Sequence, residues 1–496
     1  MAQKTKGPGR IIHSKPPSQK KPAAKIARQR LFTNEKTAIL LLFTVLLIGS
    51  FYFSLERVLY SDSSFILFRI INLGSLQPQE YRFGSFITQL FPLVGSKLHL
   101  PLSWIVLLYS ASFNFFYLAI AGILVLRLKE YSIAILMSFY FVLFVSDTYY
   151  WITNEVHQAI GWMFLFFGLT IYFLKKNSPL FISIPIFLIL GFLSIFTHPL
   201  VVFPVVFLWI FFLLVKKIPL NLTTIIFSSL LLVLLISKIL VSFRSGHYDT
   251  DKLIGLREFS ISKTWHSYTT PFVIEFLKRC LTNYWIVPIL FFAGIYSAIR
   301  LKKYVQVLWV IIFSFVYFTA MCLTFSNFLP FYTESELMPA TIIFSILFIY
   351  YTLPTLKPKM VLLILSGIFL VRLIYIAYAS EKFTERKNWL YTNLETMRTR
   401  NIRKGIIFRL EMKQKEYLSV WAVPQESMIA SALSNDEPNL TFVVGGITEL
   451  KKRLPRNNKQ ILDAYQFWDF ESLNKDYFSF DTTAHYQQIN EYFKTK

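Results

Sequence analysis

The chain has 496 residues, of which 54% are hydrophobic, 18% aromatic and only 16% charged. Soluble domains carry about 25% charged residues, so this composition excludes an ordinary soluble protein. The formal net charge of +23 raises the question of nucleic-acid binding. The distribution of that charge along the chain argues against this class.

The positive charge is concentrated at the N-terminus and in short turns. Residues 1–36 contain ten Lys or Arg and one acid, in a Pro-, Lys- and Gln-rich tract that cannot build a core. Eleven further basic residues stand in the turns 127–129, 175–176, 216–217, 300–303 and 357–359. The tail after residue 380 is nearly balanced, with 18 basic and 15 acidic residues. This pattern is typical of an orientation signal and of contact with anionic membrane lipid, and we expect no nucleic-acid partner.

Apolar segments of about 20 residues, the length of helix that crosses the hydrocarbon of a bilayer, recur along the chain. We predict eleven spans, at residues 37–54, 102–126, 131–147, 158–174, 179–197, 200–215, 219–241, 283–299, 304–326, 338–354 and 359–379. The first follows a long basic tail and lacks a small-residue cleavage site, which argues against a cleavable signal peptide.

Loop charge predicts the orientation of these spans. If the basic tail lies inside, all five basic turns fall on the same side, whereas the opposite short loops 148–157 and 327–337 contain no Lys or Arg. The odd number of spans then places residues 380–496 outside. We therefore expect a multi-pass protein of the bacterial inner (cytoplasmic) membrane with a periplasmic or extracellular C-terminal domain.

The predicted fold class is an all-α polytopic membrane protein with a small C-terminal α/β domain. Its expected parts are a disordered basic cytoplasmic tail (1–36), a multi-pass domain (37–379) with long outer loops at 55–101 and 242–282, and a soluble extracytoplasmic domain (380–496). In the last part, "KGIIFRL" and "LTFVVGG" are typical of strands, and "PQESMIASALS" and "ITELKKRL" of helices.

The first outer loop carries an acid directly after the first span. Asp62 precedes "SSFILFRIINLG", in which Phe65, Phe68 and Ile71 recur at helical spacing. This pattern predicts a short amphipathic helix that lies in the membrane interface and is too short to span it.

A second acidic stretch, "SDTYYWITNEVHQ", joins the third and fourth spans on the outer side. It contains Asp147, Glu155 and His157, together with the aromatic residues Tyr149, Tyr150 and Trp151. Aromatic residues also collect at membrane interfaces in general, so this composition alone leaves an ordinary interfacial loop open.

Ionisable residues also stand near the outer ends of later spans. Lys238 and Arg372 lie about one or two turns inside their spans, and His198 lies in the very short outer turn "FTHPLV". The two cations could extend to lipid headgroups or pair with a buried anion such as a lipid phosphate. Cys280 and Cys322 would lie near the outer ends of neighbouring spans, where a disulfide is one alternative.

This arrangement resembles the GT-C superfamily of integral-membrane glycosyltransferases. The resemblance consists of an acid after the first span, an interfacial helix in a long first outer loop, and an outside C-terminal domain after many spans. It implies transfer of a sugar from a polyprenyl-phosphate carrier to an extracytoplasmic glycan, lipid or protein, with Asp62 at the position of the family's first-loop acid. The stretch 146–158 matches the second acidic site of many members. The chain lacks an Asp-Glu pair at Asp62 and a WWD-type motif in its tail.

The chemistry assigns provisional roles to the polar residues. Sugar transfer from a lipid phosphate needs a base near the acceptor hydroxyl and cationic help for the departing phosphate. Asp62 fits the base, whereas Asp147 and Glu155 could share that role, bind acceptor hydroxyls or hold a divalent metal such as Mg²⁺ or Mn²⁺. The candidates for binding the donor phosphate are Arg82, His198, Lys238 and Arg372. Sugar faces could pack on Tyr149, Tyr150 or Trp151, and His157 could bind substrate.

Each of these residues also has a structural alternative. Asp62 could cap its helix, Asp147 could be an exposed loop acid, and His157 could bond Glu155 or the backbone. Glu334 and Glu336 could be acids that favour a helix start. The rival functional class is a transporter, flippase or assembly subunit for envelope polysaccharide, which would favour polar residues near the midplane and internal repeats. We find no convincing repeat.

Overall fold

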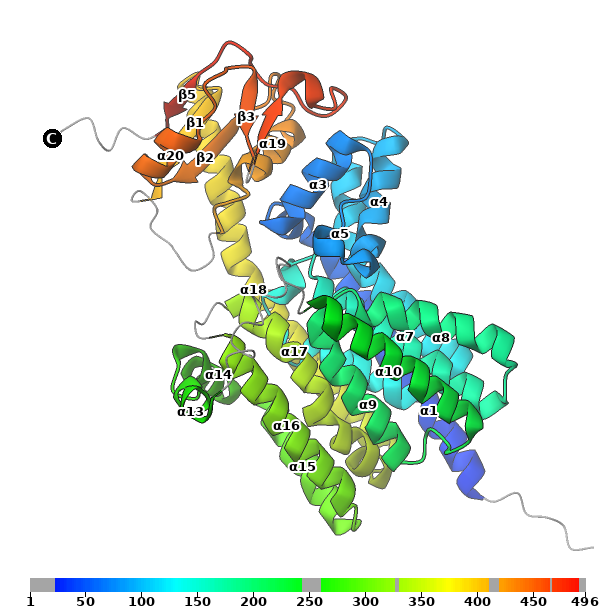
Figure 1. Ribbon diagram of the computed structural model, residues 1–496. Coiled ribbons are helices and arrows are strands. Elements are labelled where there is room, and N and C mark those ends of the chain that lie inside the picture. The colour runs from blue at the N-terminus through cyan, green and yellow to red at the C-terminus, as the bar shows by residue number, and fades with distance from the viewer. Residues whose placement is uncertain (1–22, 243–259, 326–329, 410–418, 464–465, 490–496) are drawn as a thin grey trace, which may run out of the picture.

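A computed structural model describes residues 23–242, 260–325, 330–409, 419–463 and 466–489. The protein is mostly helical: a bundle of apolar helices carries a small α/β domain at one end (Figure 1). We call this end of the bundle the domain end.

Each predicted apolar segment falls on a helix. These helices are α1 (Ala23–Tyr52), α5 (Leu102–Gly122), α6 (Tyr131–Val142), α7 (Glu155–Lys176), α8 (Leu180–Ile195), α9 (Val202–Leu214), α10 (Leu222–Ser242), α15 (Ile286–Arg300), α16 (Tyr304–Thr324), α17 (Pro330–Leu347) and α18 (Pro358–Thr399). Within the described residues, seven helices are long and apolar enough to cross a membrane, namely α1, α5, α7, α10, α16, α17 and α18. An eighth candidate combines α14 (Pro271–Leu281) and α15, which meet at 79°. Three apolar helices, α6, α8 and α9, are shorter.

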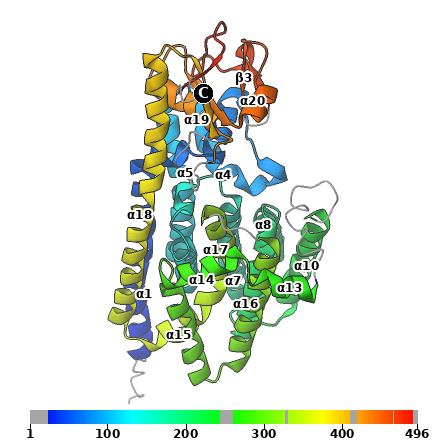
Figure 2. The same ribbon diagram turned by 90° about the vertical axis from the view of Figure 1, so that its left-hand side faces the viewer.

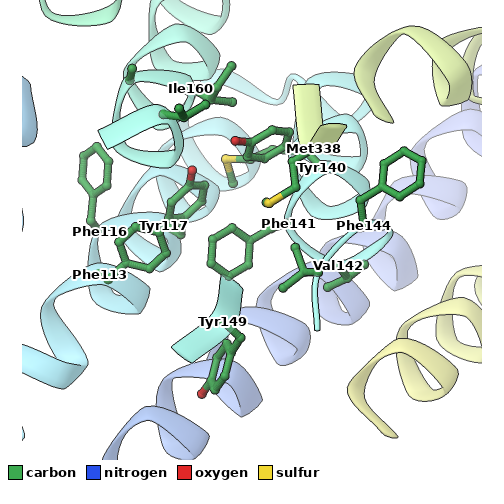
Figure 3. Packing of buried hydrophobic residues seen from close by; sticks show 14 of the residues in the cluster. Phe113, Phe116, Tyr117, Tyr140, Phe141, Val142, Phe144, Tyr149, Ile160 and Met338 are labelled. Carbon is green, nitrogen blue, oxygen red and sulfur yellow. The ribbon is translucent and has the colours of Figure 1, made fainter. Parts of the chain in front are cut away.

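Aromatic side chains pack against one another in the interior of the bundle, among many aliphatic ones. Phe113, Tyr117 and Phe141 pack together, and the rings of Tyr117 and Phe141 lie 4.3 Å apart between centroids (Figure 3). The 51 phenylalanines of the chain make this possible, because each ring buries a large area in a few rotamers. This packed cluster also includes Tyr149 and Tyr150, so it continues into the polar loop at the domain end.

The opposite end of the bundle holds basic turns together. Lys129, Asn177 and Lys216 adopt left-handed backbone conformations that end or turn the chain there. Glu130 is buried and forms ion pairs with Lys175 and with Lys217, the latter at 2.9 Å between Oε2 and Nζ. The chain segments before α6, at the end of α7 and after α9 are therefore joined through one carboxylate.

The loop 55–101 forms the predicted short helix, but the surroundings of this helix differ from the prediction. This helix is α3 (Asp62–Leu73), and α4 (Phe86–Lys97) follows it. The expected contact of its apolar face with lipid is wrong, because residues of the C-terminal domain cover that face. The ring of Phe68 lies 5.4 Å from that of Trp468 and 5.0 Å from that of Phe478.

The C-terminal domain contains the strands and helices that the sequence predicts, with three more strands. Its parallel sheet has the order β2-β1-β5, with β1 at Lys404–Phe408, β2 at Thr441–Gly445 and β5 at Tyr486–Gln488. A separate antiparallel pair joins β3 (Gln460–Leu462) to β4 (Phe467–Asp469). The two helices are α19 (Val423–Leu433) and α20 (Ile447–Arg453). In the sheet, Ile406 of β1 lies opposite Val443 of β2 and Gln488 of β5.

Helix α18 connects the two parts without a break. It has 42 residues, about 63 Å of helix, and the predicted domain boundary at residue 380 falls inside it. Figure 2 shows α18 alongside α1 in the bundle and then rising into the domain. The domain therefore stands on a rigid helical support and not on a loop.

The second long loop, predicted at residues 242–282, is partly helical. It contains α13 (Ile261–Ser267) and α14. From the sequence, His247, Asp249 and Asp251 of this loop are further candidates for binding a metal, and they lie outside the described residues. Cys280 and Cys322 have free thiols, so the alternative of a disulfide between them is not realised in this structure.

Candidate functional site

A cavity of about 580 Å³ lies at the domain end of the bundle, between α3, the start of α7, the turn before α9, the start of α17 and the C-terminal domain. Its charged lining residues are four carboxylates and two guanidinium groups, namely Asp62, Glu80, Glu155, Glu336, Arg69 and Arg82. Aromatic rings from four regions of the chain complete the wall. The cavity therefore combines charged groups with flat aromatic surfaces. Such a lining is complementary to a ligand that has both hydroxyl groups and flat apolar faces, as a sugar does.

Five of the catalytic or substrate-binding residues proposed from the sequence line this cavity. They are Asp62, Arg82, Trp151, Glu155 and His198. They come from four different stretches of the chain, so the fold brings together residues up to 136 positions apart. Their roles remain predictions, but their common location is a property of the structure.

Asp62 is the first residue of α3, where the helix begins directly after a tight bend. Burial raises the pKa of its carboxyl to about 7, and the negative charge of Glu155 acts in the same direction. The Trp151 indole and the Arg82 guanidinium oppose this change. A carboxyl group with such a pKa is both protonated and ionised near neutral pH, which suits a general base.

Arg82 and Glu155 form an ion pair in the wall of the cavity. The distance from Arg82 Nη1 to Glu155 Oε2 is 3.4 Å, and the side chains are 10% and 18% exposed. Glu155 begins α7, where the partial positive charge of the helix end favours an acid. The pair therefore lies at the surface of the cavity, with both side chains mostly buried.

His198 reaches the cavity from the turn between α8 and α9. Its Nδ1 accepts a hydrogen bond of 3.3 Å from the backbone N–H of Leu200, so the side chain caps the short helix that follows. Burial lowers the pKa of His198 well below its usual value, and the positive charges of Arg82 and Lys238 lower it further. The ring is thus neutral with its proton on Nε2, and it offers a hydrogen-bond donor and not a positive charge.

Aromatic rings face the cavity from separate elements. The rings of Trp151 and Tyr332 meet edge to face at 5.3 Å, and Trp421 of the C-terminal domain meets Phe65 of α3 in the same way at 5.3 Å. Trp421 shows that the C-terminal domain contributes directly to the wall. Its position could not be inferred from sequence, because only the folded domain brings it to α3.

Arg372 lies outside the lining of the cavity, and its donors are used elsewhere. The guanidinium donates to the carbonyl oxygens of Val142 (2.9 Å), Val145 (2.7 Å) and Asn283, and to Ser146 Oγ (3.1 Å). Helix α6 ends early, at Val142, and its last carbonyl groups need donors. In this structure Arg372 therefore stabilises the end of a helix.

The first half of the stretch 146–158 is bound into the bundle. Asp147 forms an ion pair with Lys382 of α18 and is only 4% exposed. The hydroxyl of Tyr149 donates to the carbonyl oxygen of Leu46 at 2.7 Å. Neither Asp147 nor Tyr149 lines the cavity.

His157 and Lys238 also lie behind the cavity wall. Nδ1 of His157 is 2.7 Å from the hydroxyl of Tyr140, and its backbone carbonyl accepts a hydrogen bond from Tyr117. Lys238 is 4% exposed, and its charge acts on His198. Neither residue is among those that line the cavity.

Sequence reasoning did not assign Arg69, Asn154 or Trp421 to the site. Asn154 also caps α7, since its Oδ1 accepts the backbone N–H of His157 at 3.3 Å. A signal was available for this residue: an Asn directly before an acid that starts a helix is typical of a cap. Glu336, interpreted from sequence as a helix-start charge, lines the cavity as well.

The proposed metal ligands are not gathered in one place. Asp147 pairs with Lys382, whereas Glu155 pairs with Arg82 in the cavity wall. Across the described part of the chain, no group of three or more His, Cys, Asp or Glu side chains could hold a metal ion.

Comparisons of this chain with protein-family models, with curated proteins and with solved structures found no match. The functional assignment therefore depends on the arrangement of the cavity itself.

Proposed function

We propose that the protein is a membrane glycosyltransferase that moves a sugar from a polyprenyl-phosphate carrier to an acceptor hydroxyl in the cavity at the domain end. The observation that carries the proposal is Asp62, a carboxyl with a pKa of about 7 at the wall of a cavity that also holds arginine and aromatic side chains. This combination suits a base, a departing phosphate and a sugar.

The proposal includes an eleven-span topology with the domain end outside. The three short apolar helices α6, α8 and α9 and the bent pair α14 and α15 would complete the seven longer spans. The basic turns near Glu130, Lys175 and Lys217 lie at the opposite end, as expected for a cytoplasmic side. The enzyme would then work on the outer face of a bacterial cytoplasmic membrane.

In the proposed reaction the carboxylate of Asp62 accepts the proton of the acceptor hydroxyl. The acceptor oxygen forms a bond to the anomeric carbon of the sugar, and the bond from that carbon to the phosphate oxygen breaks. The polyprenyl phosphate leaves with the electron pair of that bond. Arg69 or Arg82 balances its charge, since a guanidinium binds phosphate with two parallel hydrogen bonds.

The test compares the purified wild-type protein with the Asp62→Asn variant on a panel of labelled polyprenyl-phosphate monosaccharides. We expect sugar release or transfer by the wild type and at least about a hundredfold loss in the variant, the usual contribution of a general base. Asp469→Asn, which changes an exposed carboxylate of the C-terminal domain, is the matched control and should retain activity. Full activity of Asp62→Asn would exclude Asp62 as the base, and a wild type inactive on the whole panel would contradict the function.

A further inference from the structure

Glu426 is a buried carboxylate that joins three separate parts of the chain. It lies in α19 of the C-terminal domain and is fully buried. Its two oxygens lie 2.8 and 2.6 Å from Nη2 of Arg386 on α18, and its Oε1 accepts the backbone N–H of Ser61 at 2.7 Å. One side chain therefore joins the domain, the long connecting helix and the residue directly before Asp62.

The backbone of Ser61 needs such an anchor. Its φ of 46° and ψ of −124° belong to a region that glycine adopts readily and other residues rarely adopt. Residues keep such conformations only where their surroundings hold them. Ser61 has two contacts that reach the C-terminal domain, the backbone bond to Glu426 and a bond of 3.1 Å from its Oγ to Oγ of Ser419.

The conformation of Ser61 sets the direction in which α3 begins. Asp62 is the first residue of this helix and lines the cavity. A change in φ or ψ at Ser61 would rotate the start of α3 and move the carboxyl of Asp62 with it. The same segment of the domain places Trp421 against Phe65, one turn further along α3.

The ion pair between Glu426 and Arg386 fixes the anchor. Both side chains are almost fully buried, at 0% and 2% exposed, and Arg386 also donates to the carbonyl oxygen of Ser419 at 2.8 Å. The guanidinium lies 5.5 Å from the ring centre of Tyr60, which precedes Ser61. Glu426 therefore has little freedom to follow Ser61 if that residue relaxes.

We propose that Glu426 is a positioning residue for Asp62, so that docking of the C-terminal domain on α3 gives the cavity its active geometry. The domain is then part of the catalytic unit and not only a cover. This inference rests on the proposed function, but its structural half can be tested without any substrate.

The test uses two double variants that both remove the buried charges. Arg386→Met with Glu426→Gln keeps an amide oxygen that can accept the Ser61 N–H, whereas Arg386→Met with Glu426→Leu removes that acceptor. Removing both charges avoids the penalty of one buried unpaired charge, so both variants should fold. They differ mainly in the bond to Ser61.

The substrate-free measurement is amide hydrogen exchange of the peptide around Ser61, together with carbodiimide labelling of Asp62. We expect both to be faster in the leucine variant by about tenfold or more and to stay near the wild-type rate in the glutamine variant. Glu395→Ala, which removes an exposed ion pair with Arg398 on α18, is the control and should change neither rate. Equal rates in the two double variants would overturn the proposal, whether or not the protein transfers sugar.

The activity measurement separates positioning from stability. In the leucine variant we expect kcat to fall about tenfold to a hundredfold with little change in KM, because a misplaced base affects the chemical step. Adding Ser61→Gly should restore a large part of kcat, since glycine adopts the required backbone conformation without the anchor. A leucine variant with faster exchange but wild-type kcat, or one that Ser61→Gly does not improve, would contradict the positioning role. Absence of transfer by the wild type itself would instead contradict the proposed function.

Discussion

Two pairs of acidic residues lie around the stretch 147–155. Asp147 and Glu334 form a packed cluster, whereas Asp62 and Glu155 form an open cluster at the cavity. The two clusters differ in what surrounds them. Glu334 is 2% exposed and accepts four hydrogen bonds, from the backbone N–H groups of Ser146 (3.0 Å) and Thr148 (2.9 Å), the hydroxyl of Thr148 (3.0 Å) and that of Tyr284 (2.6 Å). Asp62, in contrast, lines an open volume and has a pKa raised to about 7. The comparison separates a carboxylate that holds the fold from one that is available for chemistry.

The two clusters use neighbouring residues of the same stretch. Asp147 and Tyr149 bind α18 and α1, while Trp151 and Glu155 line the cavity. The loop is thus anchored at its first half and exposed to the cavity at its second half. An acid-rich loop between apolar helices does not by itself reveal which half does what, because the deciding factor is the partner that the fold supplies.

The largest expected effect is the loss of stability when the packed cluster of Asp147 and Glu334 is disrupted. Glu334→Ala leaves the backbone N–H groups of Ser146 and Thr148 without their acceptor, and we expect a loss of about 3–5 kcal/mol in the free energy of unfolding. Thermal unfolding in detergent measures this. Glu381→Ala, which changes an exposed acid of α18, should have no effect. A Glu334→Ala protein as stable as the wild type would remove the distinction between the two clusters.

The next effect is the pH dependence of activity, which Asp62 of the open cluster should determine. If ionised Asp62 is the base, activity should rise with pH and reach half of its maximum near pH 7, so that activity at pH 5 is about a hundredfold below that at pH 8. The raised pKa has the opposite consequence for stability. The folded protein disfavours the ionised form, and the stabilising contribution is full below the ordinary pKa of 3.8 and is lost as pH rises through about 7.

Asp62→Asn therefore should not lower the melting temperature at pH 8, even though it removes activity. A rate profile that is flat between pH 5 and pH 8 would exclude titration of this carboxyl from the reaction.

The smallest effect is a displacement of the same pH profile. Glu155→Gln removes a negative charge that raises the pKa of Asp62, and it releases Arg82 from its partner. Both changes favour the ionised carboxylate, so the midpoint should move to lower pH by several tenths of a unit to about one unit. Glu381→Gln is the neutral control. A midpoint that moves to higher pH would mean that Glu155 does not act on Asp62 electrostatically.

The sequence predicted the helices and strands better than the contacts between residues far apart in the chain. Apolar length and turn chemistry are local properties, so the helical segments and the strands around Ile406 and Val443 could be located. Asp62, Arg82 and His198 were selected because of their common side, and they do meet at one cavity. Other contacts depend on residues far apart in the chain. The bond from Ser61 to Glu426 joins positions 365 residues apart, and no local pattern predicts it.

Two local features of the sequence nevertheless indicated the buried contact of Glu426 and the continuation of α18 past residue 380. Glu426 is the only acid in the segment "PQESMIASALS", and a lone carboxylate on a buried helix face needs a partner. Residues 380–399 continue a helical pattern after the last predicted span, but their mixed charge was interpreted as the beginning of a separate domain. The structure shows that the change in composition marks where α18 leaves the bundle, and not where it ends.

The unbroken course of α18 has a geometric consequence. Each residue of an α-helix advances the chain by about 1.5 Å and turns it by about 100°. Arg372, which binds the end of α6, and Arg386, which binds Glu426, are separated by 14 residues of the same helix, close to four full turns. The number of residues between them therefore sets both the distance along α18 and the rotation about its axis at which the C-terminal domain meets the cavity.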